Sequence, residues 1–418
     1  MQNRKAKHIS NAGTRDAKTL KIMVFCIAAC LLFCAGFLVR GNHDLMVRLG
    51  VESDEATLSL SEGVSGDAAD VAERLNEASS ILAEKSLDTY DLDAATLAVL
   101  DAFLETTDDP YSRYFDSSRY TSFIDVSTED YPGVGVFFSE YNGQAYALDV
   151  FEDSSAASEG VQPGDFVVAV DGDRSQDWTV TETVNAVQRE EGSTVVITWR
   201  RPETMDATGG KEFTTTLVCS EYQEPNVAMQ LVDTVGYVSL RQLSQNADLL
   251  VREAIQDLTE QGAASFVLDL RDNPGGYLTK AVDVASLFIK SGVVVEIETL
   301  DATTAKQASG EIATSAPLVV LVNGNTAGSA EVVAAALRDT NRATLVGTTT
   351  MGKGSVQVTQ PLSFGGALRY TAARYKSPGG YSIDGVGVSP NVTITMREGS
   401  STDNQKDLAM ETAESLAA

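Results

Sequence analysis

The sequence contains only two histidines among 418 residues, His8 and His43, and both lie before residue 50. A domain beyond residue 50 therefore lacks the side chain that acts as the base in Ser-His-Asp and Cys-His hydrolases and that binds most zinc ions. A hydrolase built from this part of the chain must use Lys, Asp or Glu as its base. The residues imply no metal ion and no cofactor.

Cysteine is also scarce. Cys26, Cys30 and Cys34 lie within one apolar segment, and Cys219 is the only cysteine outside it. The body of the protein therefore cannot form an internal disulfide. Because no histidine is present to activate its thiol, Cys219 is expected to be a buried strand residue and not a nucleophile.

Basic residues are sparse beyond the first 21 positions. Residues 1–21 contain six Lys or Arg and one Asp, a net charge of +5, whereas residues 22–418 contain 25 basic and 58 acidic residues, a net charge of −33. So acidic a body repels phosphate backbones, and nucleic acid is therefore not expected as a partner.

Residues 22–39 form an 18-residue run without a charged side chain. As a helix, this run is long enough to cross the hydrocarbon core of a bilayer. The basic residues before it predict a cytoplasmic N-terminus and an exported body. A cleaved signal peptide is the alternative, but the run is long and no clean Ala-x-Ala site follows it. The sequence favours a retained transmembrane signal anchor in the cell membrane, with the body outside the cytoplasm.

The remaining sequence predicts an α/β fold with an inserted β-rich module. Residues 40–87 have the polar composition of a linker, and residues 88–132 show helical spacing of apolar residues. Residues 133–218 contain the short strands and glycine turns of a small β-rich domain. Strands and helices alternate through residues 219–396, which predicts a βαβ-type core around a largely parallel sheet. Residues 397–418 form an acidic C-terminal tail that includes a helical stretch.

The apolar spacing of the core locates its main elements. Strands are predicted at residues 235–240, 266–270 and 317–322, and helices at residues 247–261 and 330–338. In such folds the functional residues gather in the turns after the strands.

Ser329 lies where a predicted strand gives way to a helix, so that its hydroxyl is close to N–H groups able to stabilise an oxyanion. The commoner role of such a serine is only that of a helix N-cap. Lys353 follows the next strand, between Gly352 and Gly354. A lysine removed from water can act as a base, and Gln357, four residues on, could accept a hydrogen bond from its amine.

Two other interpretations of Lys353 are considered. Lys353 could be an ordinary surface lysine, which is the usual role of an isolated Lys. Residues 347–354 (GTTTMGKG) also match the first part of a phosphate-binding loop. Gly354, however, occupies the place of the Ser or Thr that binds magnesium, so an ATPase is not expected.

Several segments, taken in chain order, resemble the carboxyl-terminal processing peptidases, also called tail-specific proteases. The resemblance covers residues from about 90 to 416, and residues 133–218 are similar to the PDZ domain of that family. The matching motifs are residues 109–114 (DPYSRY), 268–276 (LDLRDNPGG), 351–357 (MGKGSVQ) and 385–390 (GVGVSP).

The resemblance implies a Ser-Lys dyad and a role for each candidate residue. Ser329 would be the nucleophile, Lys353 the general base, and Gln357 the residue that orients the lysine. Backbone N–H groups would form the oxyanion hole, namely those of Gly275, Gly276 and Ala330. The C-terminal residues of a substrate would add a strand to the PDZ domain at a loop made of Gly133, Val134, Gly135 and Val136.

One departure from the family pattern concerns the nucleophile. The family serine usually lies three residues before the glutamate that matches Glu331, and that position is Gly328 here. One residue along a helix rotates a side chain by about 100°. Ser329 is expected to be active because Lys353, Gln357 and the glycine turn all remain.

The predicted function is that of a membrane-anchored extracytoplasmic serine endopeptidase, acting on protein or peptide substrates with free C-termini. The alternative is a catalytically inactive PDZ protein that binds peptide tails on a degenerate peptidase scaffold. A glycosidase with a pair of carboxylates is disfavoured because no placed pair is found. Whether the chain forms a homo-oligomer is left open.

Overall fold

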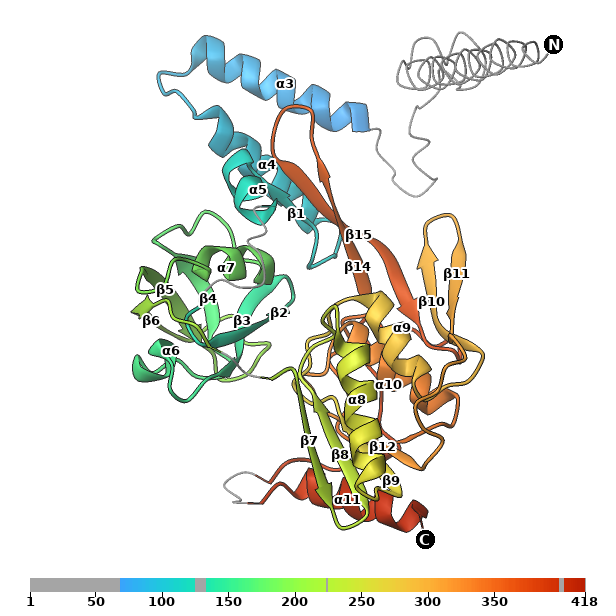
Figure 1. Cartoon of the computed structure of the whole chain (residues 1–418). Helices are drawn as coiled ribbons and strands as arrows, with labels where there is room; N and C mark the ends of the chain where they lie inside the picture. The colour runs from blue at the N-terminus through green and yellow to red at the C-terminus, as the bar shows by residue number, and fades with distance from the viewer. Residues whose placement is uncertain (1–67, 125–132, 223–224, 398–401, 418) are drawn as a thin grey trace, which may run out of the picture. The chain divides into compact units, whose positions relative to one another are not determined.

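The computed structural model describes residues 68–124, 133–222, 225–397 and 402–417 (Figure 1). The chain divides into two units, residues 1–90 and residues 91–418. Among the described residues of the first unit, the helix is α3 (Ala68–Lys85), on which Val71, Leu75 and Leu82 are exposed. The second unit contains the elements that form the candidate site.

A six-stranded sheet forms the centre of the second unit, in the order β16-β13-β12-β9-β8-β7. The strands β8, β9, β12, β13 and β16 run parallel, and β7 is antiparallel to β8. Their bounds are β7 (Val227–Val232), β8 (Val235–Leu240), β9 (Ser265–Asp269), β12 (Leu318–Val322), β13 (Thr344–Gly347) and β16 (Val392–Thr393). The continuous apolar runs of β9 and β12 are typical of strands buried on both faces.

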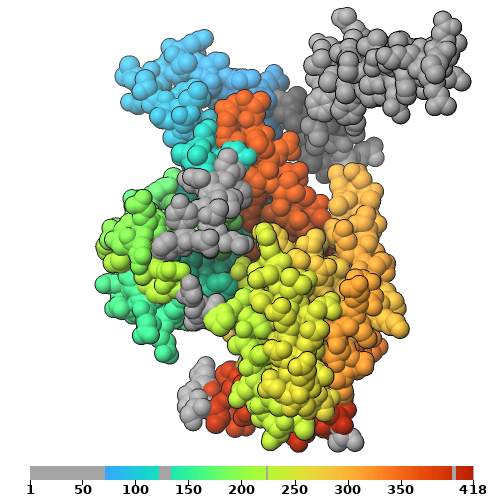
Figure 2. Space-filling view, in the orientation of Figure 1, coloured from blue at the N-terminus to red at the C-terminus, as the bar shows by residue number. Residues whose placement is uncertain are grey.

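Helices cover both faces of this sheet. Alternate residues of β12 separate the two sides, since Leu318 and Val320 pack with three helices, whereas Val319 and Leu321 pack with a fourth. The three helices are α8 (Ala247–Glu260), α9 (Leu278–Ser286) and α10 (Ser329–Asp339). The fourth is α11 (Asn404–Ala417). Helix α8 lies at the surface, in yellow in Figures 1 and 2.

The predicted core strands and helices are present in this sheet and its layers. Strand β8 has the predicted bounds, and the other elements begin or end within two residues of the prediction. The C-terminal segment is more than a tail, because Ala409 and Ala413 of α11 are fully buried against the sheet.

A separate antiparallel sheet forms the inserted module, in the order β2-β3-β4-β5-β6. Its strands are β2 (Val136–Tyr141), β3 (Gln144–Val150), β4 (Phe166–Val170), β5 (Thr194–Arg201) and β6 (Lys211–Val218), and its helices are α6 (Ser155–Ser158) and α7 (Val180–Val187). Phe138 and Trp199 stack in its core, with ring centroids 6.1 Å apart. Cys219, directly after β6, is fully buried, as expected from the sequence.

A third sheet, which the sequence analysis did not predict, combines strands from before and after the module. Before the module, β1 (Arg113–Phe115) pairs antiparallel with β15 (Ala367–Lys376), which lies near the end of the core. The same sheet contains β10 (Val293–Thr299), β11 (Thr303–Gln307) and β14 (Ser355–Pro361). The segment before β1 is α4 (Leu92–Glu105), and α5 (Ser117–Ile124) follows it. Because β1 belongs to this sheet, the β-rich module is an insertion in the chain.

No helix among the described residues is long and apolar enough to cross a bilayer. The predicted span at residues 22–39 and the basic leader before it lie outside the described residues.

The packing of α11 leads to a prediction about stability. Replacing Ala409 by Glu would place a carboxylate at a fully buried position, and we expect the free energy of unfolding to fall by roughly 3 kcal/mol. Urea denaturation measures this change. Ser415→Glu adds the same side chain to an exposed position of the same helix and serves as the control. Equal midpoints for the two variants would contradict the packing of α11 on the sheet.

Candidate active site

A buried carboxylate joins the turn of Ser329 to the loop of Lys353. Glu331 Oε2 accepts hydrogen bonds from Gly328 N at 3.0 Å and from Lys353 N at 2.8 Å, and Oε1 accepts one from Gly352 N at 2.7 Å. The hydroxyl of Thr350 also donates to Glu331. Burial raises the pKa of Glu331 to about 7, although these hydrogen bonds oppose the shift. The two predicted catalytic segments are thus fixed to one side chain.

Ser329 is the first residue of α10 and packs against the predicted glycine turn. Its side chain is 4% exposed, and its hydroxyl donates to Gly276 O at 3.1 Å. A Cβ at Gly275 would lie 2.9 Å from Ser329 N and 3.1 Å from Ser329 Oγ, closer than a side chain allows. Gly275 also has a φ of 99°, which favours glycine. The structure therefore brings Ser329, Gly275 and Gly276 together.

The predicted oxyanion hole is not assembled in this state. Gly275 N donates to Asn273 Oδ1 at 2.9 Å, and Ala330 N donates to Ala327 O at 3.1 Å. Two of the three predicted donors are therefore engaged by groups of the chain itself, and Gly276 presents its carbonyl to Ser329. Asn273, which is fully buried and also donates to Leu240 O at 2.9 Å, fixes the turn in this form.

The ammonium group of Lys353 contacts other partners than the predicted ones. Its Nζ lies 3.4 Å from Glu140 Oε1 and 5.3 Å from the ring centroid of Tyr111. Among the described residues, no hydrogen bond joins it to Ser329 or to Gln357. Gln357 Nε2 instead donates to Ser355 Oγ at 2.9 Å, two residues earlier on the same strand β14.

Comparison with known proteins identifies the family. Residues 234–394 match peptidase family S41, and residues 147–201 match a PDZ domain. The carboxyl-terminal-processing protease of Synechocystis sp. is 33% identical over 308 residues, which cover 72% of this chain and 71% of that protein. The chain belongs to peptidase family S41.

Other relatives agree with this assignment. The carboxy-terminal-processing protease of Bartonella bacilliformis is 31% identical over 293 residues, which cover 68% of this chain and 66% of that protein. Among solved structures, the photosystem II D1 C-terminal processing protease has a TM-score of 0.61 at 28% identity and covers 77% of this chain and 86% of its own. The S41 chain is accordingly a serine-type peptidase with a mixed α/β fold and a PDZ domain.

Glu140 is the partner of Lys353 in this S41 peptidase, and the sequence analysis missed it. It lies on β2 of the PDZ domain, is fully buried, and accepts hydrogen bonds from Arg369 Nη2 at 2.9 Å and Arg369 Nη1 at 3.3 Å. Burial acts to raise its pKa, but the positive charges of Lys353 and Arg369 hold that pKa well below its usual range. No spacing in the sequence marked this residue, because its partner Lys353 is 213 positions away.

The predicted peptide-binding loop of the PDZ domain lines a groove of about 460 Å³. Gly133, Val134, Gly135 and Val136 belong to its lining, as do Val184 and Val187 of α7. Strand β2 stands at the end of its sheet order, so its outer edge can pair with an extended peptide.

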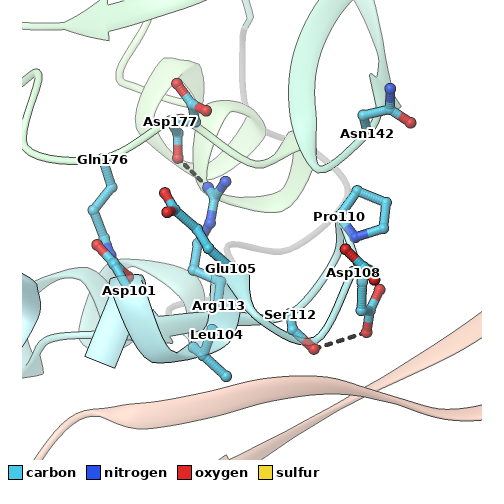
Figure 3. A pocket seen from close by; sticks show the side chains of 11 residues that line it. Asp101, Leu104, Glu105, Asp108, Pro110, Ser112, Arg113, Asn142, Gln176 and Asp177 are labelled. Carbon is cyan, nitrogen blue, oxygen red and sulfur yellow. Dashed lines mark hydrogen bonds between the residues drawn. The ribbon is translucent and has the colours of Figure 1, made fainter. Parts of the chain in front are cut away.

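A second concavity, of about 570 Å³, lies at the start of the second unit (Figure 3). Its lining is rich in acidic side chains, among them Asp101, Glu105 and Asp177, and the Arg113 side chain donates to Asp177 O. None of the predicted site residues lines this concavity, so it is not the candidate active site.

The buried ion pairs of Glu140 lead to a prediction about pH. A carboxyl with a lowered pKa stabilises the fold above its ordinary pKa of about 4.5, and this contribution is lost as the pH falls below that value. At pH 7 we expect Glu140→Gln to lower the free energy of unfolding by about 3 kcal/mol, and the difference from wild type to narrow below about pH 4.5. Urea denaturation at a series of pH values measures the difference in the free energy of unfolding and its change with pH.

Glu159→Gln, at an exposed position of the same domain, is the control and should leave the pH dependence unchanged. A difference between Glu140→Gln and wild type that stays constant from pH 7 to pH 4 would show that Glu140 is not ionised in a pair.

Proposed function

We propose that this S41 peptidase is a membrane-anchored serine endopeptidase that cleaves protein substrates near their C-termini outside the cytoplasm, with Ser329 and Lys353 as its catalytic dyad. The observation that carries the proposal is the packing of Ser329 against the Gly275–Gly276 turn, combined with the attachment of the Lys353 loop to the same helix through Glu331. These contacts bring the segments that contain Ser329 and Lys353 close to the glycine turn, which supports the proposed roles.

The proposed chemistry is acyl transfer in two halves. The neutral amine of Lys353 takes the proton of the Ser329 hydroxyl as the oxygen attacks the scissile carbonyl, and the resulting oxyanion accepts hydrogen bonds from N–H groups of the glycine turn. Lys353 then protonates the leaving amine, and the peptide bond breaks. A water molecule, deprotonated by the same lysine, then attacks the acyl group, the bond between that group and Ser329 Oγ breaks, and Lys353 returns the proton to the Ser329 oxygen.

This chemistry requires Lys353 to leave Glu140. Here Lys353 Nζ lies 3.4 Å from Glu140 Oε1, and among the described residues no hydrogen bond joins it to Ser329. The Glu140–Lys353 ion pair therefore supports a resting form of the enzyme. Because Glu140 belongs to the PDZ strand β2, a movement of that strand would separate the pair, and Gln357 could then accept a hydrogen bond from the released amine.

Gly328 raises the question of which position carries the nucleophile. It adopts a φ of 59°, and a Cβ at this position would lie 3.3 Å from Pro274 O and 4.0 Å from Gly275 Cα. A side chain at position 328 would thus face the same glycine turn as Ser329. We propose that Ser329 serves as the nucleophile because its hydroxyl already lies against Gly276.

The substrate class is inferred from the PDZ domain and from the relatives. The printed names of the relatives describe carboxyl-terminal processing, and the edge of β2 is suited to a peptide with a free C-terminus. The location of the enzyme is proposed from the sequence alone, namely from the apolar run at residues 22–39 and the basic residues before it.

The dyad is tested by cleavage of an unfolded reporter protein with an apolar C-terminal tail. Removal of either catalytic group should reduce kcat/KM by about 1,000-fold or more, so we expect Ser329→Ala and Lys353→Ala each to be nearly inactive and their double variant to be no worse than either. Ser382→Ala and Lys290→Ala, at exposed positions, are the matched controls and should retain wild-type turnover.

The same assay separates Ser329 from its neighbour. If Ser329→Ala retains turnover, or if Gly328→Ser creates activity that wild type lacks, Ser329 is not the nucleophile. If wild type binds the tail but never cleaves it, the chain acts as a peptide-binding protein.

A further inference from the structure

The groove of the PDZ domain includes a residue of the peptidase core. Most of its lining comes from residues 133–138 and from α7, but Gln242, in the loop after β8, also lines it. Gln242 is exposed. A peptide that pairs with β2 would therefore meet a side chain from outside the PDZ domain.

The backbone of Gln242 is held firmly in place. The side-chain amide of Asn226 contacts it on both sides, since Asn226 Nδ2 donates to Gln242 O at 3.0 Å and Asn226 Oδ1 accepts from Gln242 N at 2.9 Å. The neighbouring Arg241 pairs with Asp149 of β3 at 2.6 Å and lies 5.6 Å from the ring centroid of Phe151. The loop is thus attached to the PDZ domain as well as to the core.

The next residue connects this loop to the glycine turn. Leu243 N donates to Gly275 O at 2.9 Å, and Tyr277 N donates to Leu243 O at 2.9 Å. Leu243 is fully buried. Gln242 therefore lies one residue, or about 3.8 Å along the chain, from a backbone pairing with the turn that contacts Ser329.

The chemistry of the groove favours neutral donors for a peptide carboxylate. Within the described lining there is no Lys or Arg, and Glu221 is the one charged residue. Gln188 already has an interaction partner, whereas the hydroxyl of Tyr222, which accepts a hydrogen bond from Ser155 N at 3.1 Å, keeps its O–H as a second neutral donor. The exposed carboxamide of Gln242 can donate without giving up a contact.

We propose that Gln242 is a specificity residue of the peptidase, and that its carboxamide donates a hydrogen bond to the C-terminal carboxylate of a peptide bound in the PDZ groove. This inference rests on the proposed peptide-binding role of that groove. It assigns part of the recognition of the C-terminus to the peptidase core, at a loop that is bonded directly to the glycine turn.

Peptide binding tests the proposal without any cleavage. The full chain in detergent carries Ser329→Ala so that the peptide stays intact, and fluorescence anisotropy gives the Kd of a labelled ten-residue peptide with an apolar C-terminus. The peptide is used as the free acid and as the C-terminal amide. Gln242→Ala and Gln242→Glu are compared with Gln245→Ala and Gln245→Glu, at an exposed position three residues further along the chain.

We expect Gln242→Ala to weaken binding of the free acid by about tenfold, since a hydrogen bond to a charged group is lost, and Gln242→Glu to weaken it further by charge repulsion. The amide should bind weakly and equally to all variants, and the Gln245 variants should match the parent. Equal losses for acid and amide would overturn carboxylate recognition by Gln242.

Val184→Asp, which places a charge in the groove, separates this inference from the proposed function. If Val184→Asp abolishes binding while the Gln242 variants bind like the parent, the groove binds peptide but Gln242 takes no part. If the parent does not bind, or if Val184→Asp has no effect, the peptide-binding role of the groove fails together with the inference.

Discussion

The carboxylate of Glu331 is the constraint on which the candidate active site depends. Three backbone N–H groups and one hydroxyl converge on it, from the start of α10 and from the loop after β13. Parallel strands bring these two segments to the same edge of the sheet, and Glu331 then fixes their separation. A buried carboxylate is costly unless such donors satisfy it, so the fold at this edge and the geometry of the site stabilise each other.

A second buried carboxylate, that of Glu140, contacts the Lys353 ammonium group. Glu140 belongs to the PDZ domain, yet its partners Lys353 and Arg369 belong to the core. The lysine that Glu331 positions through its backbone is therefore held at its ammonium group by another domain. One strand, β2, therefore carries Glu140 and also forms the outer edge of the PDZ sheet.

The sequence predicted those parts of the fold that depend on local pattern. The buried strands β8, β9 and β12 and the amphipathic helix α8 follow from apolar spacing, which is determined by neighbouring residues. The sheet of β1, β10, β11, β14 and β15 was missed, since its pairings join distant segments, as Arg113 does with Arg369. The packing of α11 was missed for the same reason, because two buried alanines give little signal in an acidic sequence.

The site shows the same division. The proximity of Ser329 to Gly275 and Gly276 was implied by the resemblance to the family, and it is present. The partner of Lys353 was not predicted, because an isolated glutamate in a strand has no pattern that distinguishes it from a surface charge. The side chain of Gln357 contacts Ser355 on its own strand and Thr371 on β15, and the second contact depends on a pairing of distant segments.

The central claim is that Ser329 is the nucleophile although Gly328 stands at the position usual in the family. Covalent labelling with a fluorophosphonate, followed by mass spectrometry of the digested full chain, tests it most directly. In the presence of a peptide with an apolar C-terminus, the account predicts a single adduct on Ser329 that is absent from Lys353→Ala. An adduct on another residue, or none on a chain that has bound the peptide, would contradict it.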